Sequence, residues 1–416
     1  MKNSKLHSSG ELIALIISNI KSKRFDEALV LLEKISDKDS NIINSLKGSI
    51  YLSKQVWEKS LIYYRKIPDK EKTFKILNNI GFALFKLGRF SEASLKFIQS
   101  INNNKVFIPA YKNIVISYKL MGQYDLAVKY ILKGLNIMPE NDILKNHLID
   151  IFNYHQTKIY KNETISINHL IKKFDPVKRE NELIKSSLIK NILEKSEVIL
   201  KDQNISFNYP ETQIFRRNKL RLHCERQFGI FNQYKIIPKF CFRCYKVQIS
   251  LANVVDLIKL YFYFNDLHLE KNNTRKCMIE LRENISGNYK GFIYVNSIKE
   301  AKNIKKVVEN DLINKDINLK KIDIKHGCSE FYDQFNLFKN TNEDITNKVY
   351  QKEWENIEND FDRDNFITEN IKEKVFNNTL NKFNLPDFLV IKNWLLYAKI
   401  INDNSVQQIF KFELNN

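Results

Sequence analysis

The first third of the chain repeats itself with a period of 34 residues. The segment ILNNIGFALFKLGRFSEASLKFIQSINNNKVFI is followed by AYKNIVISYKLMGQYDLAVKYILKGLNIMPEND, and an offset of 34 aligns Leu84 with Tyr118 and Gly88 with Gly122. A period of this length is typical of stacked helical hairpins, because one hairpin alone is too small to bury its apolar face. The repeat therefore predicts an all-helical solenoid over this part of the chain.

Residue size within the repeat explains how each hairpin closes. Small residues such as Ala93 let two antiparallel helices approach, and large residues such as Phe97 fill the space between them. Gly88 stands where the first helix must end, a position that favours the left-handed conformation. Weaker copies precede these two at offsets of 33 and 32 residues, and they lack the turn glycine, with Lys21 and Lys54 near its place.

About four hairpins fit into residues 10–139, and a cap helix is expected near residues 141–154. This pattern resembles the tetratricopeptide repeat family over residues 10–154, a resemblance that implies an α-solenoid whose concave face binds a peptide or a partner protein. Asn79 and Asn113 occupy the same repeat position. In that family the position faces the groove, so the resemblance implies two peptide-binding amides that are free in the unbound chain.

The periodicity changes after a helical linker over residues 155–210. Residues 211–330 contain six segments that alternate between strand and helix patterns: KFCFRCYKVQIS, ANVVDLIKLYFYFNDL, RKCMIELR, YKGFIYV, SIKEAKNIKKVVENDLI and NLKKIDIKHG. The order β-α-β-β-α-β predicts a ferredoxin-like domain, with a four-stranded antiparallel sheet and two helices on one face. Residues 331–416 are expected to form helices that pack on this domain. The fold class is thus α+β overall, with an all-α solenoid first.

Two further resemblances concern this second part. The stretch from TQIFRRN to HGCSEF is similar to a functionally uncharacterised domain found attached to tetratricopeptide repeats, which implies no activity. The strand Lys290-Gly291-Phe292-Ile293-Tyr294-Val295 resembles the first signature of the RNA-recognition motif, in which ring positions stack bases on an open sheet. That resemblance implies base stacking on Phe292 and Tyr294. Ile293 departs from it, because the signature has a small residue there.

Five cysteines lie within this second part of the chain, and they leave three interpretations open. Cys224, Cys241, Cys244 and Cys328 fall at one edge of the predicted sheet if Cys241 lies in the turn before its strand. Four thiols can hold zinc or an iron–sulfur cluster, with Cys277, His223 or His326 as a substitute ligand. The thiols can also be core filling, since cysteine behaves as a small apolar residue, or serve redox or nucleophilic chemistry.

Charge provides a weaker signal. The net charge is +19, but residues 1–155 hold 24 basic and 14 acidic residues and the remainder 43 and 34, so the excess is spread along the chain. Nucleic-acid binding is therefore possible but not favoured. Seven of the twelve arginines lie between Arg216 and Arg282, which indicates either structural ion pairs or a site for an anion or ligand. The residues proposed for such a site are Arg216, Arg217, Arg275, Lys276, Arg282 and His326.

The expected location and function follow from these observations. The N-terminal stretch lacks a small-residue cleavage site, and no apolar run approaches the ~18 residues of a membrane span, so we expect a cytoplasmic protein that does not enter membranes. The leading hypothesis is an adaptor that binds a protein through its repeats, with a second domain of unknown activity. The alternatives are a metalloprotein or enzyme that uses the cysteine edge, and RNA binding through the sheet.

Overall fold

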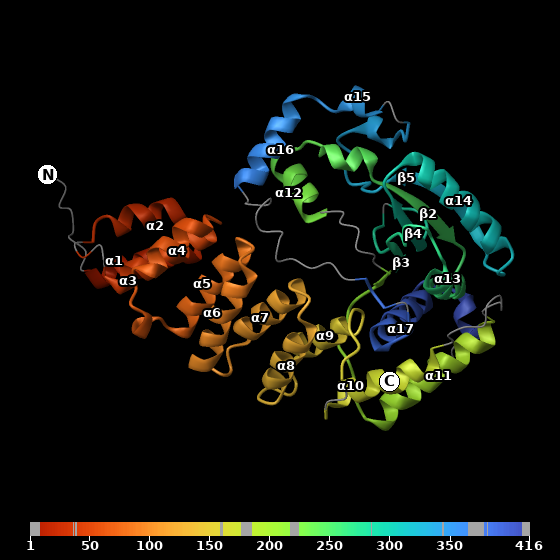
Figure 1. The fold of residues 1–416 in the computed structure, drawn as a ribbon, viewed down its shortest axis with the longest axis horizontal. Helices are drawn as coiled ribbons and strands as arrows, with labels where there is room; N and C mark the ends of the chain where they lie inside the picture. Colours follow the sequence, from red (N-terminus) through yellow and green to blue (C-terminus); the bar gives the residue numbers. More distant parts are fainter. Residues whose placement is uncertain are drawn as a thin grey trace. The chain divides into compact units, whose positions relative to one another are not determined.

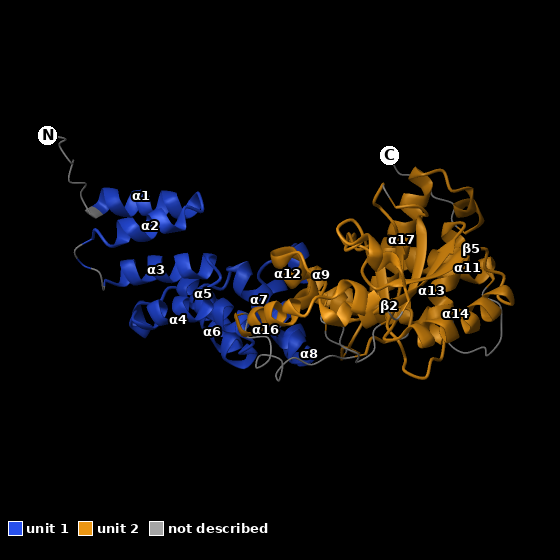
Figure 2. Ribbon diagram, turned by 90° about the horizontal axis from the view of Figure 1, so that it is seen from above, with its two compact units in different colours: residues 1–144, 365–375 blue, residues 145–364, 376–416 orange. Residues whose placement is uncertain are grey.

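The structure is a computed structural model of the 416-residue chain. It describes residues 9–35, 37, 40–158, 161–175, 185–216, 224–283, 285–342, 345–364, 378–380 and 382–409. These residues form two compact units (Figure 2), which we call the helical unit, up to Leu144, and the sheet unit, from Lys145 onward.

The helical unit consists of four antiparallel hairpins (Figure 1). The hairpins pair α1 (Ser9–Lys21) with α2 (Phe25–Leu32), α3 (Asn41–Ser53) with α4 (Trp57–Arg65), α5 (Phe74–Lys86) with α6 (Phe90–Asn103), and α7 (Ile108–Leu120) with α8 (Tyr124–Leu135). Helix α9 (Asp142–Ile151) follows, and the division between the two units falls within it. A short 3-10 helix, η1 (Asp69–Glu71), lies between the second and third hairpins.

Every hairpin turns through one residue in the left-handed conformation. Gly88 and Gly122 have φ angles of 74° and 71°, which confirms the expected turn glycines. In the first two hairpins the equivalent residues are Lys23, with φ of 59°, and Gln55, with φ of 61°, rather than Lys21 and Lys54. The first two hairpins therefore have the same turn geometry without glycine. The left-handed conformation is energetically unfavourable for Lys23 and Gln55, because both residues have a Cβ atom.

The first helices of successive hairpins form the inner layer of the array. Helix α3 contacts α5 and α5 contacts α7, whereas contacts between successive second helices are weaker. Close packing of one layer and wider spacing of the other curve a repeat array toward the closely packed side. We call the exposed surface of α3, α5 and α7 the inner face.

The sheet unit contains a five-stranded, fully antiparallel sheet in the order β1-β3-β4-β2-β5. Its strands are β1 (Gln213–Arg216), β2 (Tyr245–Leu251), β3 (Arg275–Ile279), β4 (Tyr289–Val295) and β5 (Leu319–His326). Strand β1 is an edge strand that the sequence did not predict. It pairs with β3 through four residues.

Helices of the sheet unit precede, connect and follow the strands. They are α10 (Glu163–Ile171), α11 (Ser186–Asp202), α12 (Cys224–Tyr234), α13 (Val254–Asp266), α14 (Ile298–Ile313), α15 (Ile345–Val349), α16 (Glu353–Asp364) and α17 (Leu385–Ile400), with short 3-10 helices at η2 (Lys172–Phe174), η3 (Lys239–Arg243), η4 (Asn336–Lys339) and η5 (Asn404–Gln408). Asn253 and Ser297 cap α13 and α14, the helices between β2 and β3 and between β4 and β5. Helix α17 packs against β1 and α13.

The two faces of the sheet differ in chemistry. Gly291 of β4 faces α13, because a Cβ atom there would lie 2.3 Å from a methyl group of Leu260. Ile249 and Cys277 are its partners across the sheet and share this face. Side chains alternate along strands, so their neighbours point to the opposite side. We call that side the lysine face, after its lysine side chains, and its members include Lys246, Gln248, Lys276, Lys290, Phe292 and Tyr294.

Candidate functional site

The inner face of the helical unit is positively charged. Helices α3, α5 and α7, each described throughout, contain five lysines and no aspartate or glutamate. One of the five, Lys47, is buried and pairs with Glu33 at 3.1 Å. Lys75, Lys86 and Lys112 are exposed. The acidic residues of these three hairpins lie instead on the second helices and loops, so the two layers differ in electrostatic potential.

Asn79 and Asn113 lie along this layer, but their amides are not free. The Nδ2 atom of Asn79 donates to the hydroxyl of Tyr64 at 3.0 Å, and Nδ2 of Asn113 donates to Oδ1 of Asn78 at 3.0 Å. Both asparagines are half-buried, and neither is in the fully buried hairpin core. The expectation of free amides is therefore wrong, because these side chains help to join successive hairpins.

Aromatic rings lie among the lysines of the inner face. Phe82 is half-buried, and the Trp57 ring meets it edge-on at a centroid distance of 6.1 Å. The ammonium group of Lys86 lies 5.4 Å from the centre of the Phe82 ring. Ile116 takes the place of Phe82 one repeat later and is also half-buried. The inner face thus combines cations with partly exposed apolar surface, as binding faces often do.

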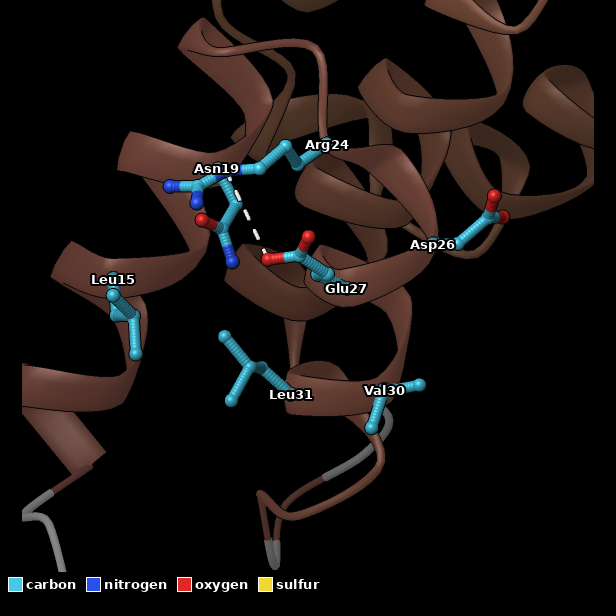
Figure 3. A pocket seen from close by; sticks show the side chains of 7 residues that line it. All are labelled: Leu15, Asn19, Arg24, Asp26, Glu27, Val30 and Leu31. Atoms are coloured by element: carbon cyan, nitrogen blue, oxygen red, sulfur yellow. Dashed lines mark ion pairs between the residues drawn. The ribbon is translucent and has the colours of Figure 1, made fainter.

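A separate hollow lies between α1 and α2 (Figure 3). It has a volume of about 550 Å³ and is lined by Leu15, Asn19, Arg24, Asp26, Glu27, Val30 and Leu31. Its ion pair joins Arg24 to Glu27 at 3.8 Å, and both side chains are more than half exposed. The hollow contains none of the residues that the sequence singled out.

At one end of the sheet, backbone hydrogen bonds join the segment that precedes β2 to the segment that follows β5, and both segments carry cysteines. Cys241 lies in η3, before the strand, as the sequence required if the thiols were to converge. The Cys244 N–H donates to the Cys241 carbonyl at 3.3 Å, and the Gly327 N–H donates to the Cys244 carbonyl at 2.8 Å. Cys328 follows directly, so these backbone bonds place Cys241, Cys244 and Cys328 at the same end of the sheet.

The thiols at this end differ in environment. Cys241 and Cys244 are buried, Cys328 is half-buried, and Cys224 is exposed at the start of α12. The hydrogen bond from Cys241 lowers the pKa of Cys328, with further lowering by the ammonium groups of Lys246 and Lys276 against burial and Glu330. Hydrogen bonding to Cys328 and burial raise the pKa of Cys241, and burial raises that of Cys244 to about 12. Among Cys241, Cys244 and Cys328, the thiol of Cys328 thus has the lowest pKa.

The arrangement does not support the predicted zinc or iron–sulfur site. Across the described ranges of the chain, no group of three or more histidine, cysteine or acidic side chains is placed to hold a metal ion. Cys277 lies on the α13 face of the sheet. His326 is buried and stacked between the rings of Tyr245 and Phe338, and His223 lies outside the described residues.

Two lysines converge on one aromatic ring of the lysine face. The ammonium nitrogens of Lys246 and Lys276 lie 5.3 and 5.1 Å from the centre of the Phe292 ring. Phe292 is only 6% exposed, so base stacking on this ring is excluded and the corresponding prediction is corrected. Tyr294 shares the face, as expected, and is half-buried.

Most residues of the predicted anion site serve the fold instead. Arg216 is buried and pairs with Asp387 of α17 at 2.8 Å. Arg275 is buried and donates to the carbonyls of Phe264 and Leu267, at 2.8 and 2.5 Å. Because these donors are already used, neither guanidinium offers the planar fork that an anion needs.

The other members of that set lie apart. Arg282 pairs with Glu280, at 2.8 Å, and with Glu330. His326 lies with Nε2 3.1 Å from the Asn340 carbonyl oxygen, and Arg217 lies outside the described residues. Lys276 lies near another cation, Lys246, because both ammonium groups approach the Phe292 ring. The sequence reasoning missed Lys246, although a lysine in a strand of otherwise apolar and aromatic residues was a usable signal.

Comparisons with known proteins found similarity to solved structures alone. No family model and no curated protein matches the chain. A solved structure of MamA, described as MSR-1 C2, is 23% identical and covers 33% of this chain and 81% of that one, with a TM-score of 0.30. A structure described as the functional characterization of PilF from Pseudomonas aeruginosa is 15% identical and covers 47% and 85%, with a TM-score of 0.32.

The helical unit is related to tetratricopeptide repeats at the level of the fold. This conclusion rests on its own features, namely the 34-residue period, the paired helices and the left-handed turn in each hairpin. Among the described residues, no helix is both long enough and apolar enough to cross a membrane.

Proposed function

We propose that this chain is an adaptor whose helical unit binds an acidic segment of a partner protein on its inner face. The observation that carries the proposal is the charge of α3, α5 and α7, which hold five lysines and no carboxylate. A face of one charge sign raises the local concentration of oppositely charged partners and orients them before contact.

The inner face also offers an apolar anchor. Exposed ion pairs contribute little singly, typically less than about 1 kcal/mol each. Affinity must therefore come in part from apolar contact, for which the half-buried Phe82 and Ile116 are suited. The expected ligand is an extended peptide with several acidic residues and at least one aliphatic or aromatic side chain.

Peptide binding to the full chain tests the proposal. Fluorescein-labelled acidic peptides of fixed length, with and without one leucine, would be titrated and followed by anisotropy at low and high salt. The double variant Lys75→Glu/Lys112→Glu is expected to lose most binding. The matched control, Lys96→Glu/Lys129→Glu, makes the same charge change on second helices. Equal loss in both variants, or binding that ignores salt, would contradict the assignment of the inner face.

We further infer that the sheet unit is a ferredoxin-like domain with one added edge strand, and that it recognises a second partner. Support comes from the order β5-β2-β4-β3, with α13 and α14 in the two connections. We place the protein in the cytoplasm, a proposal supported by five cysteines of which none is in a disulfide, since disulfides form in oxidising compartments. Alkylation of rapidly quenched cells would test this location, because it shows whether the five thiols are reduced inside the cell.

A further inference from the structure

Lysines outnumber their carboxylate partners on the lysine face of the sheet. Strand register adds Lys321, Asp323 and Lys325 of β5 to this face, because their partners on β2 belong to it. Its lysines are therefore Lys246, Lys276, Lys290, Lys321 and Lys325. We propose that Lys246, Lys276 and Lys325 bind a phosphate group of a small ligand. The inference rests on the proposal that the sheet unit recognises a second partner, and it gives that partner a chemical class.

Two of the five lysines are already neutralised by carboxylates. Lys290 Nζ lies 3.3 Å from Glu280, and Lys321 Nζ lies 3.0 Å from Asp323. Within the described ranges of the chain, no carboxylate lies within 4 Å of the other three ammonium nitrogens. The lysine face thus holds three cations that lack a direct ion-pair partner among the described residues.

Glu330 acts on this cluster from farther away. Its carboxylate pairs with Arg282 at 3.5 Å and is about half exposed. Burial lowers the pKa of Lys246 and lowers that of Lys276 to about 8, and the charge of Glu330 opposes this effect only in part. Glu330 therefore does not neutralise the two buried lysines, and an additional anion would stabilise their charged forms.

The sheet brings the three cations together. Lys276 on β3 and Lys246 on β2 flank Phe292 on β4, and their ammonium nitrogens lie 5.1 and 5.3 Å from the centre of its ring. Lys325 on β5 is the direct partner of Lys246 across the sheet, and directly opposed side chains on one face are neighbours. Three adjoining positions therefore present positive charge to the same side of the sheet.

Each of the two buried lysines keeps hydrogen-bond donors for a ligand. Lys246 Nζ donates to the Gly327 carbonyl at 3.0 Å, and Lys276 Nζ donates to Oε1 of Gln213 at 3.4 Å. An ammonium group has three donors, so further donors remain on each. Lys246 is only 7% exposed, and a buried ammonium without an anion is energetically costly. A bound phosphate group would offset that cost and accept the remaining hydrogen bonds.

The arrangement favours a terminal phosphate over other anions. Lysine binds phosphate as a compact point charge, whereas a planar carboxylate is better matched by the fork of arginine. Lys276 and Lys325 are half-buried and connect the deeper Lys246 to solvent. A terminal phosphate can enter such a site end-on. A nucleic-acid strand would need an exposed ring for base stacking, and Phe292 is only 6% exposed.

The first test uses the full wild-type chain and needs no substitution. Because the pKa of Lys276 is near 8, more of its amine is unprotonated near neutral pH than that of an ordinary exposed lysine. Trace acetylation with acetic anhydride would be followed by mass spectrometry, with and without pyrophosphate at constant ionic strength. Pyrophosphate should slow acetylation of Lys276 several-fold and leave Lys302, an exposed lysine on α14, unchanged. Equal effects on both lysines, or no effect on Lys276, would overturn the proposal.

Variants then locate the binding site by isothermal titration calorimetry with pyrophosphate. Lys246→Met and Lys276→Met should each weaken binding at least about tenfold, as expected for loss of a hydrogen bond between charged groups. The matched control is Lys321→Met, which makes the same charge change on the same face at a lysine that Asp323 already neutralises. It should bind within about twofold of wild type. Equal weakening in all three variants would contradict the assigned site.

Two further arms separate this proposal from its alternatives. Phenyl phosphate should protect Lys276 as pyrophosphate does, and protection by single-stranded RNA alone would overturn the proposal in favour of nucleic acid. The inner-face variant Lys75→Glu/Lys112→Glu should retain pyrophosphate binding. Loss of binding in that variant, with none in Lys246→Met, would assign the anion to the helical unit instead. Acidic peptides are titrated separately, so peptide binding and phosphate binding can each fail alone.

Discussion

The buried ion pair between β1 and α17 allows a quantitative test of the sheet unit. Arg216 Nη2 lies 2.8 Å from Asp387 Oδ2, and Nη1 lies 3.3 Å from Oδ1. The two side chains are 4% and 2% exposed, and the Tyr261 hydroxyl donates to the same carboxylate at 2.8 Å. Asp387→Ala is expected to lower the free energy of unfolding of the sheet unit by about 3–5 kcal/mol.

The magnitude follows from what remains after the carboxylate is removed. Arg216 still donates to Asn265 at 2.6 Å and to the Phe215 carbonyl at 3.2 Å, so it stays in place as an uncompensated buried charge. Burial alone would lower the pKa of Arg216, but Asp387 and Tyr261 raise it, so the charged form of Arg216 depends on the Asp387 carboxylate. The double variant Arg216→Met/Asp387→Leu removes both charges and should recover most of the loss.

Trp394 provides the assay. It is buried on α17, and its Nε1 donates to the Thr212 carbonyl at 2.8 Å, next to β1. In a chain with Trp57 and Trp354 replaced by phenylalanine, tryptophan emission during urea unfolding reports this region alone. Following one local probe matters, because a chain with two compact units need not unfold in one transition.

An exposed ion pair provides the control for Asp387→Ala. Asp360→Ala removes the partner of Arg363 in an exposed pair, 71% and 56% open to solvent, and should change stability by less than about 0.5 kcal/mol. The reasoning is refuted if Asp387→Ala costs less than about 1 kcal/mol. It is equally refuted if the double variant is no more stable than the single one.

Two further predictions concern the turns and the lysine face. Gly88 and Gln55 both have left-handed backbone conformations. Gly88→Ala should therefore lower the free energy of unfolding of the helical unit by about 1 kcal/mol and lower its thermal midpoint, whereas Gln55→Gly should raise the midpoint. Burial lowers the pKa of Lys276 from 10.5 to about 8, and Lys246 adds to the effect. Between about pH 8 and 10.5 only the unfolded chain holds that proton, so stability should rise with pH in this window. Lys276→Met should be more stable than wild type at pH 7, and its stability should not rise with pH. Urea midpoints measured from pH 7 to 10.5 test this prediction, and a wild-type midpoint that does not change with pH would contradict it.

The helical repeats were predictable because their determinants are local. Gly88 and Gly122 predict the turns at which they lie, and small and large residues recur at the repeat positions of Ala93 and Phe97, where they close each hairpin. The mixed class, helical repeats followed by a unit with an antiparallel sheet, is confirmed. Strand β1 was not predicted, because four residues are too few to show a strand periodicity. Its formation also depends on pairing with β3, which is distant in the sequence.

The candidate sites were only partly predictable. That Cys241 and Cys328 lie at one end of the sheet followed from strand order and from Pro238 before the turn, and the backbone of the structure places both residues there. The cluster of arginines gave no such guide. A guanidinium that binds an anion and one that joins β1 to α17 have the same sequence signature, and only the position of Asp387, 171 residues away, separates them.

The choice of turn residue also sets the order in which the repeat array opens. Lys23 and Gln55 hold the left-handed conformation at a cost of about 1 kcal/mol each relative to glycine, and the first hairpin has a neighbour on one side only. In a linear array such differences accumulate from one end, so the amide hydrogens of α1 to α4 should exchange faster than those of α5 to α8. A partner that lies along the inner face would then order the N-terminal hairpins as it binds, and part of its binding energy would appear as folding.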